Sequence, residues 1–118
     1  MTDQEINTAI AEACGWKFVR MVHLRAILED GLCGHPPACN YDAGIPDYCN
    51  DLNAMHGACI AELKTEDKRG NMLDELCKIV RRDHNRDDGP MTAVIQAFYA
   101  TARQRAEAFL RTLGKWVE

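Results

Sequence analysis

The sequence contains no apolar run of the length that a membrane-spanning helix requires, which is about 18 to 20 residues. It also lacks the basic start and apolar middle of a signal peptide, because residues 1–16 are acidic and polar. An excess of positive charge is missing too. The formal net charge of the 118-residue chain is −4, which argues against general binding of nucleic acid. We therefore expect a cytoplasmic protein with no membrane contact and no direct binding of nucleic acid.

Motifs that would indicate a particular chemistry are also missing. The chain has no nucleophile motif, no phosphate-binding loop and no closely spaced pair of metal ligands that is repeated later. Six cysteines are present, but without an export signal a disulfide framework is not expected, because cytosolic thiols stay reduced. Three of them fall among apolar helical positions, where a reduced thiol acts as a small buried hydrophobe: Cys14, Cys59 and Cys77.

The first part of the chain predicts a helix followed by a strand. Thr2 and Glu5 have the spacing of a capping box, and apolar residues repeat at helical intervals up to Gly15, which predicts a helix over 3–14. Residues 16–24 alternate and are rich in β-branched and aromatic residues, which predicts a strand. The residues expected on one face of this strand are Trp16, Phe18, Val22 and Leu24, with Arg20 interrupting them.

A loop and two helices are predicted in the middle of the chain. Residues 31–46 are rich in glycine and proline, so we expect a long loop. Pro46 fits the first position of a helix with Asp47 in its first turn, and a third helix follows the polar stretch KTEDKRGN. The residues expected to be buried are Tyr48, Leu52, Met55, Cys59 and Leu63 on the first of these helices, and Met72, Leu73, Leu76, Ile79 and Val80 on the second. Cations suited to a helix C-terminus follow: Arg81, Arg82 and His84.

The last part predicts a turn at 85–90, a strand over 91–100 and a final helix. The near-continuous apolar character of 91–100 indicates a strand buried on both faces. Thr101 and Gln104 form a second capping box. The final helix is expected to bury Ala102, Ala106, Phe109, Leu110 and Leu113, to end at Gly114, and to be followed by Trp116 folded back onto the core. The resulting order, α-β-α-α-β-α, predicts a single helix-rich α+β domain over 1–118, with a small sheet of few strands flanked by helices.

Three segments carry a resemblance to a known family. INTAIAEACGW (6–16) supplies an opening helix and a tryptophan, IPDYCNDLNAMH (45–56) supplies a helix after a proline, and ATARQRAEAFLRTLGKW (100–116) supplies a strand-to-helix step and a second tryptophan. Together they resemble the phage α-β-α (ABA) sandwich domain, a family of small bacteriophage and prophage proteins without settled activity. The resemblance implies the fold and a phage context but no catalytic residues. GACIAEL stands where the family commonly continues with an acidic, alanine-rich segment.

One group of residues has the side chains that bind zinc. It consists of Cys33, His35, Cys39 and Cys49. Zinc in proteins takes four nitrogen or sulfur ligands in a tetrahedron, and the usual sequence signature is a close pair repeated later. The spacing in this chain is irregular, so zinc is the weaker interpretation, and we expect loop cysteines and no cofactor.

Polar residues are also dense between Asp47 and His56. Neighbouring carboxylates such as Asp47 and Asp51 can hold Mg²⁺, but Asp47 equally suits a helix N-terminus. On a helix, Cys49 and His56 would be about two turns apart, near 10 Å, which is too far for a thiol–imidazole hydrogen bond. We therefore interpret these residues as anchors of a structural helix. The basic stretch 78–86 is likewise interpreted as a solvated helix end.

The sequence favours a non-catalytic binding protein over an enzyme. An acidic, compact phage protein could occupy a basic surface of a host protein or nucleoprotein complex and so inhibit a host defence system, as anti-CRISPR proteins do. The residues expected to contact such a partner are Asp42, Asp47, Asp51, Glu62, Glu66 and Asp67. A homodimer and a structural subunit of the virion are left open.

The alternative is a protein that binds or sequesters a small ligand such as a nucleotide, or a minor hydrolase. Its site would lie between the loop 31–46 and the helix expected after Pro46. The residues expected to converge there are His35, Asp51, His56 and Arg82.

Overall fold

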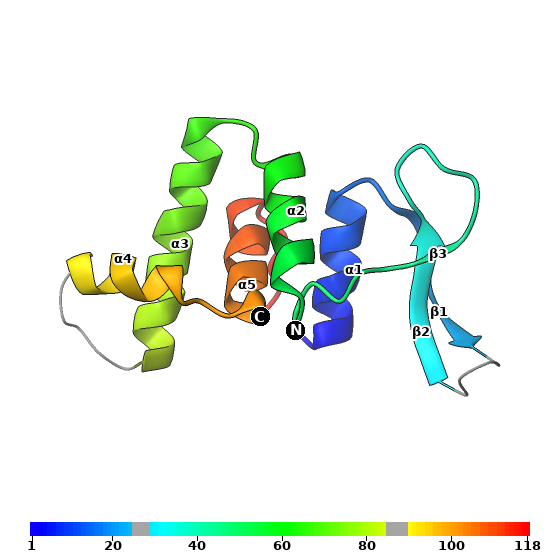
Figure 1. The fold of residues 1–118 in the computed structure, drawn as a ribbon, viewed down its shortest axis with the longest axis horizontal. Helices are drawn as coiled ribbons and strands as arrows, with labels where there is room; N and C mark the ends of the chain where they lie inside the picture. The colour runs from blue at the N-terminus through cyan, green and yellow to red at the C-terminus, as the bar shows by residue number, and fades with distance from the viewer. Residues whose placement is uncertain (25–28, 85–89) are drawn as a thin grey trace.

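The computed structural model describes residues 1–24, 29–84 and 90–118, and these form an α+β fold with a small antiparallel sheet (Figure 1). The side chains of 23, 24, 29, 30 and 90–93 lie outside the described part. In chain order the elements are α1 (Asp3–Ala13), β1 (Lys17–Leu24), β2 (Glu29–His35), β3 (Ala43–Gly44), α2 (Leu52–Glu62), α3 (Glu66–His84), α4 (Pro90–Phe98) and α5 (Ala102–Thr112). The predicted fold class is confirmed, and the predicted order of elements matches roughly.

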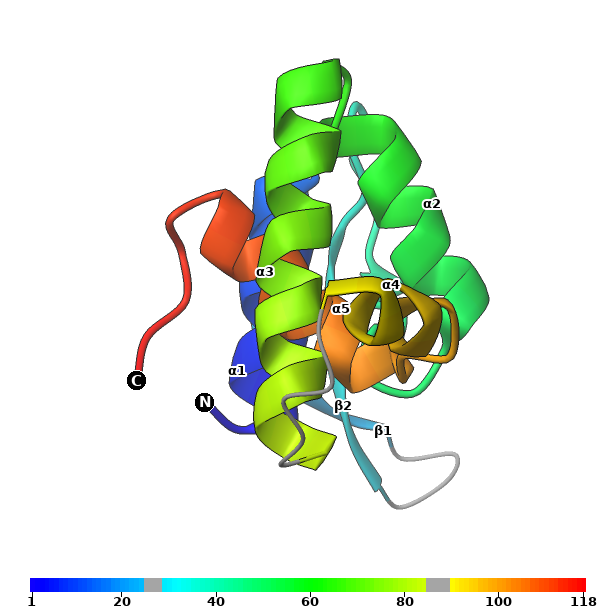
Figure 2. The same ribbon diagram turned by 90° about the vertical axis from the view of Figure 1, so that its left-hand side faces the viewer.

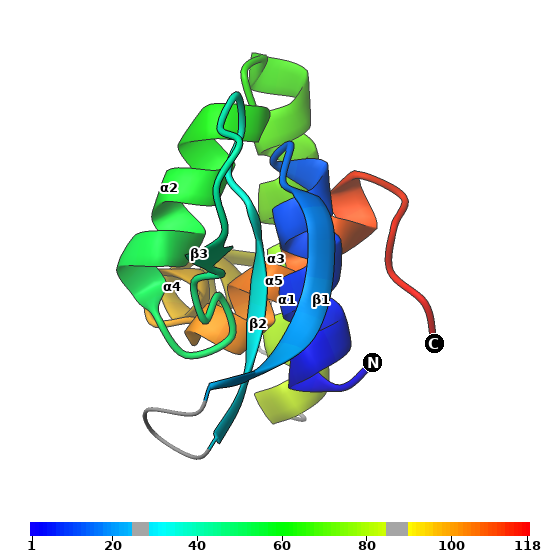
Figure 3. The same cartoon turned by 90° about the vertical axis from the view of Figure 1, so that its right-hand side faces the viewer.

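The molecule measures 49 × 31 × 24 Å, and its elements lie in layers along the longest dimension. The sheet is at one end, α1 lies beside it, α2 and α5 follow, and α3 with α4 forms the other end (Figure 1). Viewed from the sheet end, β1 covers α1, and β2 and β3 continue toward α2 (Figure 3). Helix α5 packs against α1, α2 and α3 and is therefore the centre of the helical part.

The two capping boxes in the sequence predict the starts of α1 and α5 correctly. Thr2 Oγ1 accepts a hydrogen bond from the Glu5 amide at 3.2 Å, and the Glu5 carboxylate accepts one from the Thr2 amide at 3.1 Å. Thr101 and Gln104 form the same reciprocal pair at α5. Such a pair satisfies amides that the first helical turn leaves without partners.

Segment 31–46 is not one long loop, because β2 and β3 take up part of it. β2 pairs with β1 and with β3, both antiparallel, in the order β1-β2-β3. A Cβ on Gly34 would lie 3.0 Å from the Lys17 carbonyl oxygen and 3.3 Å from Val19 Cα. This glycine, which suggested a loop, is therefore needed for the close approach of two strands.

The expected alternation along β1 holds only in part. The register shifts between Lys17 and Arg20, and Phe18 has a φ of 56° in that irregularity. Its side chain is 69% exposed, so Phe18 is not on a buried face. The side chain of Leu24 lies outside the described part, as does most of the turn expected at 85–90.

The second helix begins later than predicted, at Leu52 and not at Pro46. Asp51 is its N-cap and accepts hydrogen bonds from the amides of Asn53 and Ala54. Residues 46–50 form turns, so Asp47 is not in a helical first turn. Tyr48, Met55 and Leu63 are buried as expected, but Leu52, the first residue of the helix, is 50% exposed.

Helix α3 begins at Glu66, inside the polar stretch that was expected to interrupt the pattern. Four of its five expected core residues are buried, namely Met72, Leu76, Ile79 and Val80. Leu73 is 45% exposed, so its assignment to the core is wrong. Arg81, Arg82 and His84 occupy the last turn, as predicted.

The strand predicted over 91–100 is wrong, because Pro90–Phe98 is helix α4. Pro90 is its first residue, a position that suits proline because the fixed φ is helical and no amide is needed. The segment is not buried on both faces either. Ala97 and Ala100 face the core, whereas Ile95 is 53% exposed and Phe98 is 77% exposed.

The core lies between the helices. Its largest fully buried side chains are Phe109, Ile6, Ile10, Met55, Leu110 and Val80. Trp116 packs against this cluster after Gly114, whose φ of 70° reverses the chain. No helix within the described ranges, 1–24, 29–84 and 90–118, has the length and apolar character needed to span a bilayer.

Two glycine substitutions should change stability in opposite directions. Gly114→Ala forces a Cβ into left-handed backbone and should destabilise the fold by about 1 kcal/mol. Gly57→Ala, in the exposed interior of α2 with nothing within 4 Å of the new Cβ, should stabilise it by about 0.5–1 kcal/mol. Urea unfolding of the two variants measures both, and shifts of the same sign would contradict the assignment.

Candidate functional site

The six carboxylates expected to form an acidic face are distributed over the molecule. Asp42 lies beside the sheet, Asp47 lies in the turns before α2, and Asp51 caps α2. Glu62 is at the opposite end of α2, about 16 Å along the helix axis. Glu66 and Asp67 are in the first turn of α3, where their charges favour the helix dipole.

Asp42 belongs to a small polar cluster on the sheet. Its two carboxylate oxygens accept hydrogen bonds from Arg20 at 3.0 and 2.6 Å, and His35 Nε2 lies 3.3 Å from Oδ1. The hydrogen bond from Arg20 holds the pKa of Asp42 below its ordinary value. Phe18 contacts the His35 ring edge-on, with the ring centroids 4.9 Å apart. The cluster joins β1 to the β2–β3 connection and leaves Asp42 engaged within the protein.

Asp47 is also engaged within the protein. Its carboxylate accepts hydrogen bonds from the side-chain amides of Asn7 at 3.0 Å and Asn50 at 2.9 Å. Asn7, which is buried on α1, also accepts a bond from the Cys49 amide at 3.1 Å. Asn7 therefore fastens the turns before α2 to α1, a role that sequence reasoning missed because its partners are some forty residues away.

The four residues of the small-ligand alternative are not brought together. His35 lies on the sheet with Asp42, Asp51 is occupied as a helix cap, and His56 is exposed on α2. Arg82, near the end of α3, donates hydrogen bonds to both carboxylate oxygens of Glu107 at 2.7 and 3.0 Å. A site formed by all four is therefore not supported by the arrangement of these side chains.

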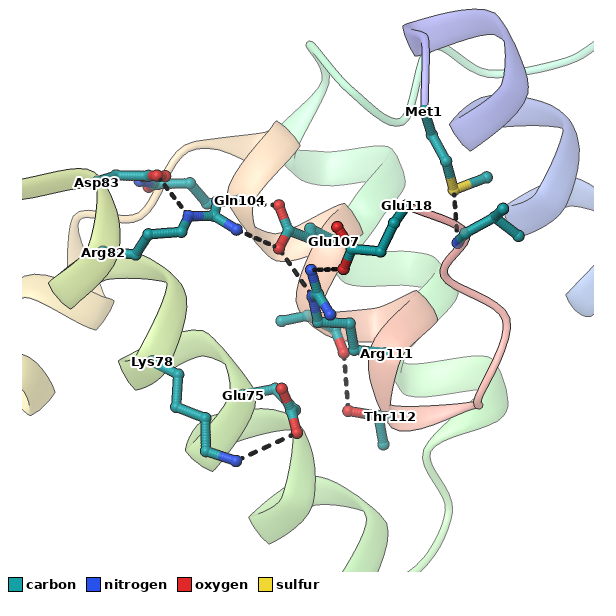
Figure 4. A network of polar contacts seen from close by, with 12 residues as sticks. Met1, Glu75, Lys78, Arg82, Asp83, Gln104, Glu107, Arg111, Thr112 and Glu118 are labelled. Carbon is teal, nitrogen blue, oxygen red and sulfur yellow. Dashed lines mark hydrogen bonds and ion pairs between the residues drawn. The ribbon is translucent and has the colours of Figure 1, made fainter.

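Glu107 is the centre of an ionic network between α3 and α5 (Figure 4). It is 7% exposed, and besides Arg82 it accepts a bond from Arg111 at 2.8 Å. Burial alone would raise the pKa of its carboxyl, but the hydrogen bonds from the two arginines outweigh burial and hold the pKa below its ordinary value. Arg111 also binds Glu118 and lies over the Trp116 ring at 5.2 Å.

The cysteines do not gather with other ligands into a metal-binding group in the described part of the chain. All six are free, and no three or more His, Cys, Asp or Glu side chains among the described residues are placed to hold an ion. Burial raises the pKa of Cys49 to about 11, and its thiol lies 3.7 Å from the Asp3 carbonyl oxygen. Burial likewise raises the pKa of Cys14 and Cys59 to about 11, which disfavours thiolates.

A groove of about 530 Å³ lies between α2 and α3. A short turn joins the two helices at one end (Figure 2). Exposed apolar side chains line the groove: Leu52 and Ile60 come from α2, and Leu73 comes from α3. Buried Leu63, Met72 and Leu76 also line it.

The charged side chains that line the groove are arginines. The Arg69 Nε donates to the Leu63 carbonyl oxygen at 2.9 Å, and Arg105 donates to carbonyl oxygens at the end of α4. Carbonyl groups at a helix C-terminus attract cations, so these contacts hold both guanidinium groups in place. His56, one residue of the small-ligand alternative, also lines the groove.

Sequence reasoning missed the groove because it assigned Leu52 and Leu73 to the core and left Ile60 without a role. A signal was present, since α2 carries apolar residues on more than one side. A helix with apolar residues on several sides is normally buried on several sides. When one side is exposed, its apolar residues form a surface that can bind a partner.

Comparisons with protein families, with curated proteins and with solved structures find no match for this chain. The resemblance to the phage α-β-α sandwich domain therefore stays a prediction from the three sequence segments.

Glu107→Gln should show that the network is structural. Removing the charge leaves two arginines without their shared partner, and we expect a loss of about 1 to 3 kcal/mol at neutral pH. Because the folded pKa of Glu107 is lowered, its contribution is present above the ordinary carboxyl pKa of 4.5 and is lost as pH falls through the folded value. The difference between wild type and variant should therefore shrink on acidification.

Glu75→Gln is the matched control. Glu75 pairs with Lys78 at 3.5 Å on the surface of α3, so its loss should cost less than about 0.5 kcal/mol. Urea unfolding across pH measures both variants. Equal costs for the two, or a Glu107→Gln deficit that does not change with pH, would contradict the network's role.

Proposed function

We propose that the chain is a non-catalytic binding protein that contacts a partner protein through the groove between α2 and α3. One observation carries the proposal, which is the exposure of large apolar side chains along that groove. Leu52 is 50% exposed, Ile60 is 61% exposed and Leu73 is 45% exposed. Contiguous apolar surface of this kind marks interaction sites in proteins that otherwise bury such residues.

The end of helix α4 carries two further exposed apolar side chains. Phe98 and Tyr99, at and just after its end, are 77% and 84% exposed, and the Phe98 carbonyl oxygen accepts a hydrogen bond from groove residue Arg105 at 3.2 Å. Large aromatic side chains contribute much of the binding energy at protein interfaces. The backbone of Phe98 contacts groove residue Arg105, so the proposed contact surface includes the end of α4.

This proposal replaces the expected acidic face with an apolar one as the main contact. Asp42, Asp47 and Asp51 accept hydrogen bonds within the protein, whereas the apolar side chains of the groove, Leu52, Ile60 and Leu73, are exposed. A host protein or nucleoprotein complex as partner, inhibition of a host defence system, and a cytoplasmic location remain proposals that rest on the sequence alone.

A small ligand in the same groove is the second candidate. Its volume falls in the range of ligand pockets, and His56 gives it one group that can donate or accept a proton. A thermal-shift panel of nucleotides and divalent metals tests this candidate, because a ligand in hundredfold excess over its Kd adds about 2.7 kcal/mol of stability. A panel without any shift would count against it.

Ile60→Glu should remove partner binding without unfolding the protein. The side chain is 61% exposed, so the fold should tolerate the charge, but a carboxylate in an apolar interface should weaken binding at least about tenfold. Val117→Glu is the matched control, because Val117 is 65% exposed and lies outside the groove. Pull-downs from bacterial lysate with both variants measure the difference, and equal recovery of every captured protein would contradict the proposal.

A further inference from the structure

The groove has the form of a site for a helix. The part of α2 that lines it runs from Leu52 to Leu63, which is about 16 Å of helix axis. Apolar side chains stand on both walls, and buried residues such as Leu76 form its deeper part. Amphipathic helices bind such grooves through apolar residues at every third or fourth position. A partner helix of about three turns therefore fits its length.

The charge of the groove is opposite to that of the chain. The formal net charge of the protein is −4, yet no carboxylate is among the residues that line the groove in the described structure. Arg69 and Arg105 are both there, and neither has a carboxylate partner among the described residues. Both are held by backbone carbonyl groups, so little conformational freedom remains to be lost when an anion binds them.

We propose that the occupant is an amphipathic helix of a partner protein whose apolar stripe is flanked by Asp or Glu. This inference rests on the proposed function, since it names the kind of partner that the same groove takes. The apolar stripe fills the space between Ile60 and Leu73, and the flanking carboxylates meet Arg69 and Arg105. Electrostatic complementarity of this kind chooses between partners of similar apolar character.

A second copy of the chain fits the groove less well. The exposed apolar helix that it would offer is α4, and the segment Pro90–Phe98 contains no acidic residue. If α4 docked in the groove, both guanidinium groups would lose part of their hydration. They would gain no carboxylate in return, which is unfavourable. Charge complementarity therefore favours an acidic helix over self-association.

Two synthetic peptides test the charge preference. Both are stapled helices of about 16 residues with leucines at i, i+4, i+7 and i+11, and they differ only in carrying Glu or Lys beside the stripe. Fluorescence anisotropy with the full chain measures their affinities. We expect the Glu peptide to bind about tenfold more tightly at low salt, with the preference decreasing at high salt because exposed ion pairs are screened.

Substitution of Arg69 locates the preference in the groove. Arg69→Gln should reduce the preference for the Glu peptide over the Lys peptide about threefold. Arg69→Lys should keep most of this preference because the charge remains. Lys115→Gln is the control, since it removes one charge from an exposed position outside the groove and should leave the preference unchanged. Circular dichroism of each variant verifies that the helices are intact.

The outcomes separate this inference from the proposed function. If Ile60→Glu removes the natural partner but the peptides bind equally, or neither binds, the groove is a contact site and the acidic helix is wrong. If light scattering shows a dimer that Ile60→Glu dissociates, the occupant is a second copy, and the inference is wrong as well. If Ile60→Glu affects neither the partner nor the peptides, the groove is not the contact site and both proposals fail.

Discussion

Burial of α5 is the constraint on which the rest of the structure depends. Phe109 and Leu110 are completely buried because α1, α2 and α3 all pack against this helix. Enclosure also buries Glu107, and a buried carboxylate is stable only when it is paired. Arg82 supplies the pair from α3, and the bond fixes α3 relative to α5. The wall of the groove that α3 contributes is thus positioned by a charge pair some distance from it.

The sequence predicts the fold best where the determining contacts are local. Thr2 with Glu5 and Thr101 with Gln104 bond across a single turn, and both helix starts are correct. The predictions fail where distant contacts decide. β2 exists because β1 pairs with it, and the apolar run of α4 is helical because it packs on α3. A short apolar run is equally compatible with a buried strand and a helix, so its periodicity alone could not decide.

The candidate site shows the same division between local and distant contacts. Asp51 was expected inside a helix that starts at Pro46, with Asp47 at the N-terminus, but Asp51 is itself the N-cap of α2. The apolar residues on several sides of α2 indicate spare apolar surface, but the place of the groove depends on which side of α2 is covered by α5. Leu52 is the first residue of α2 and is exposed there, and the exposure of Ile60 and Leu73 is visible only once the packing of α2 and α3 is known.

The sheet stands outside the core that holds the helices together. No residue of the described buried cluster lies in β1, β2 or β3, and the sheet meets the helices chiefly through the contact of β1 with α1. Few buried contacts imply a low free energy of local opening, so the strands form a cooperative unit separate from that of α5. Backbone amides of β1 and β2 should then exchange with solvent deuterium through sub-global opening, while those of α5 exchange only when the whole chain unfolds.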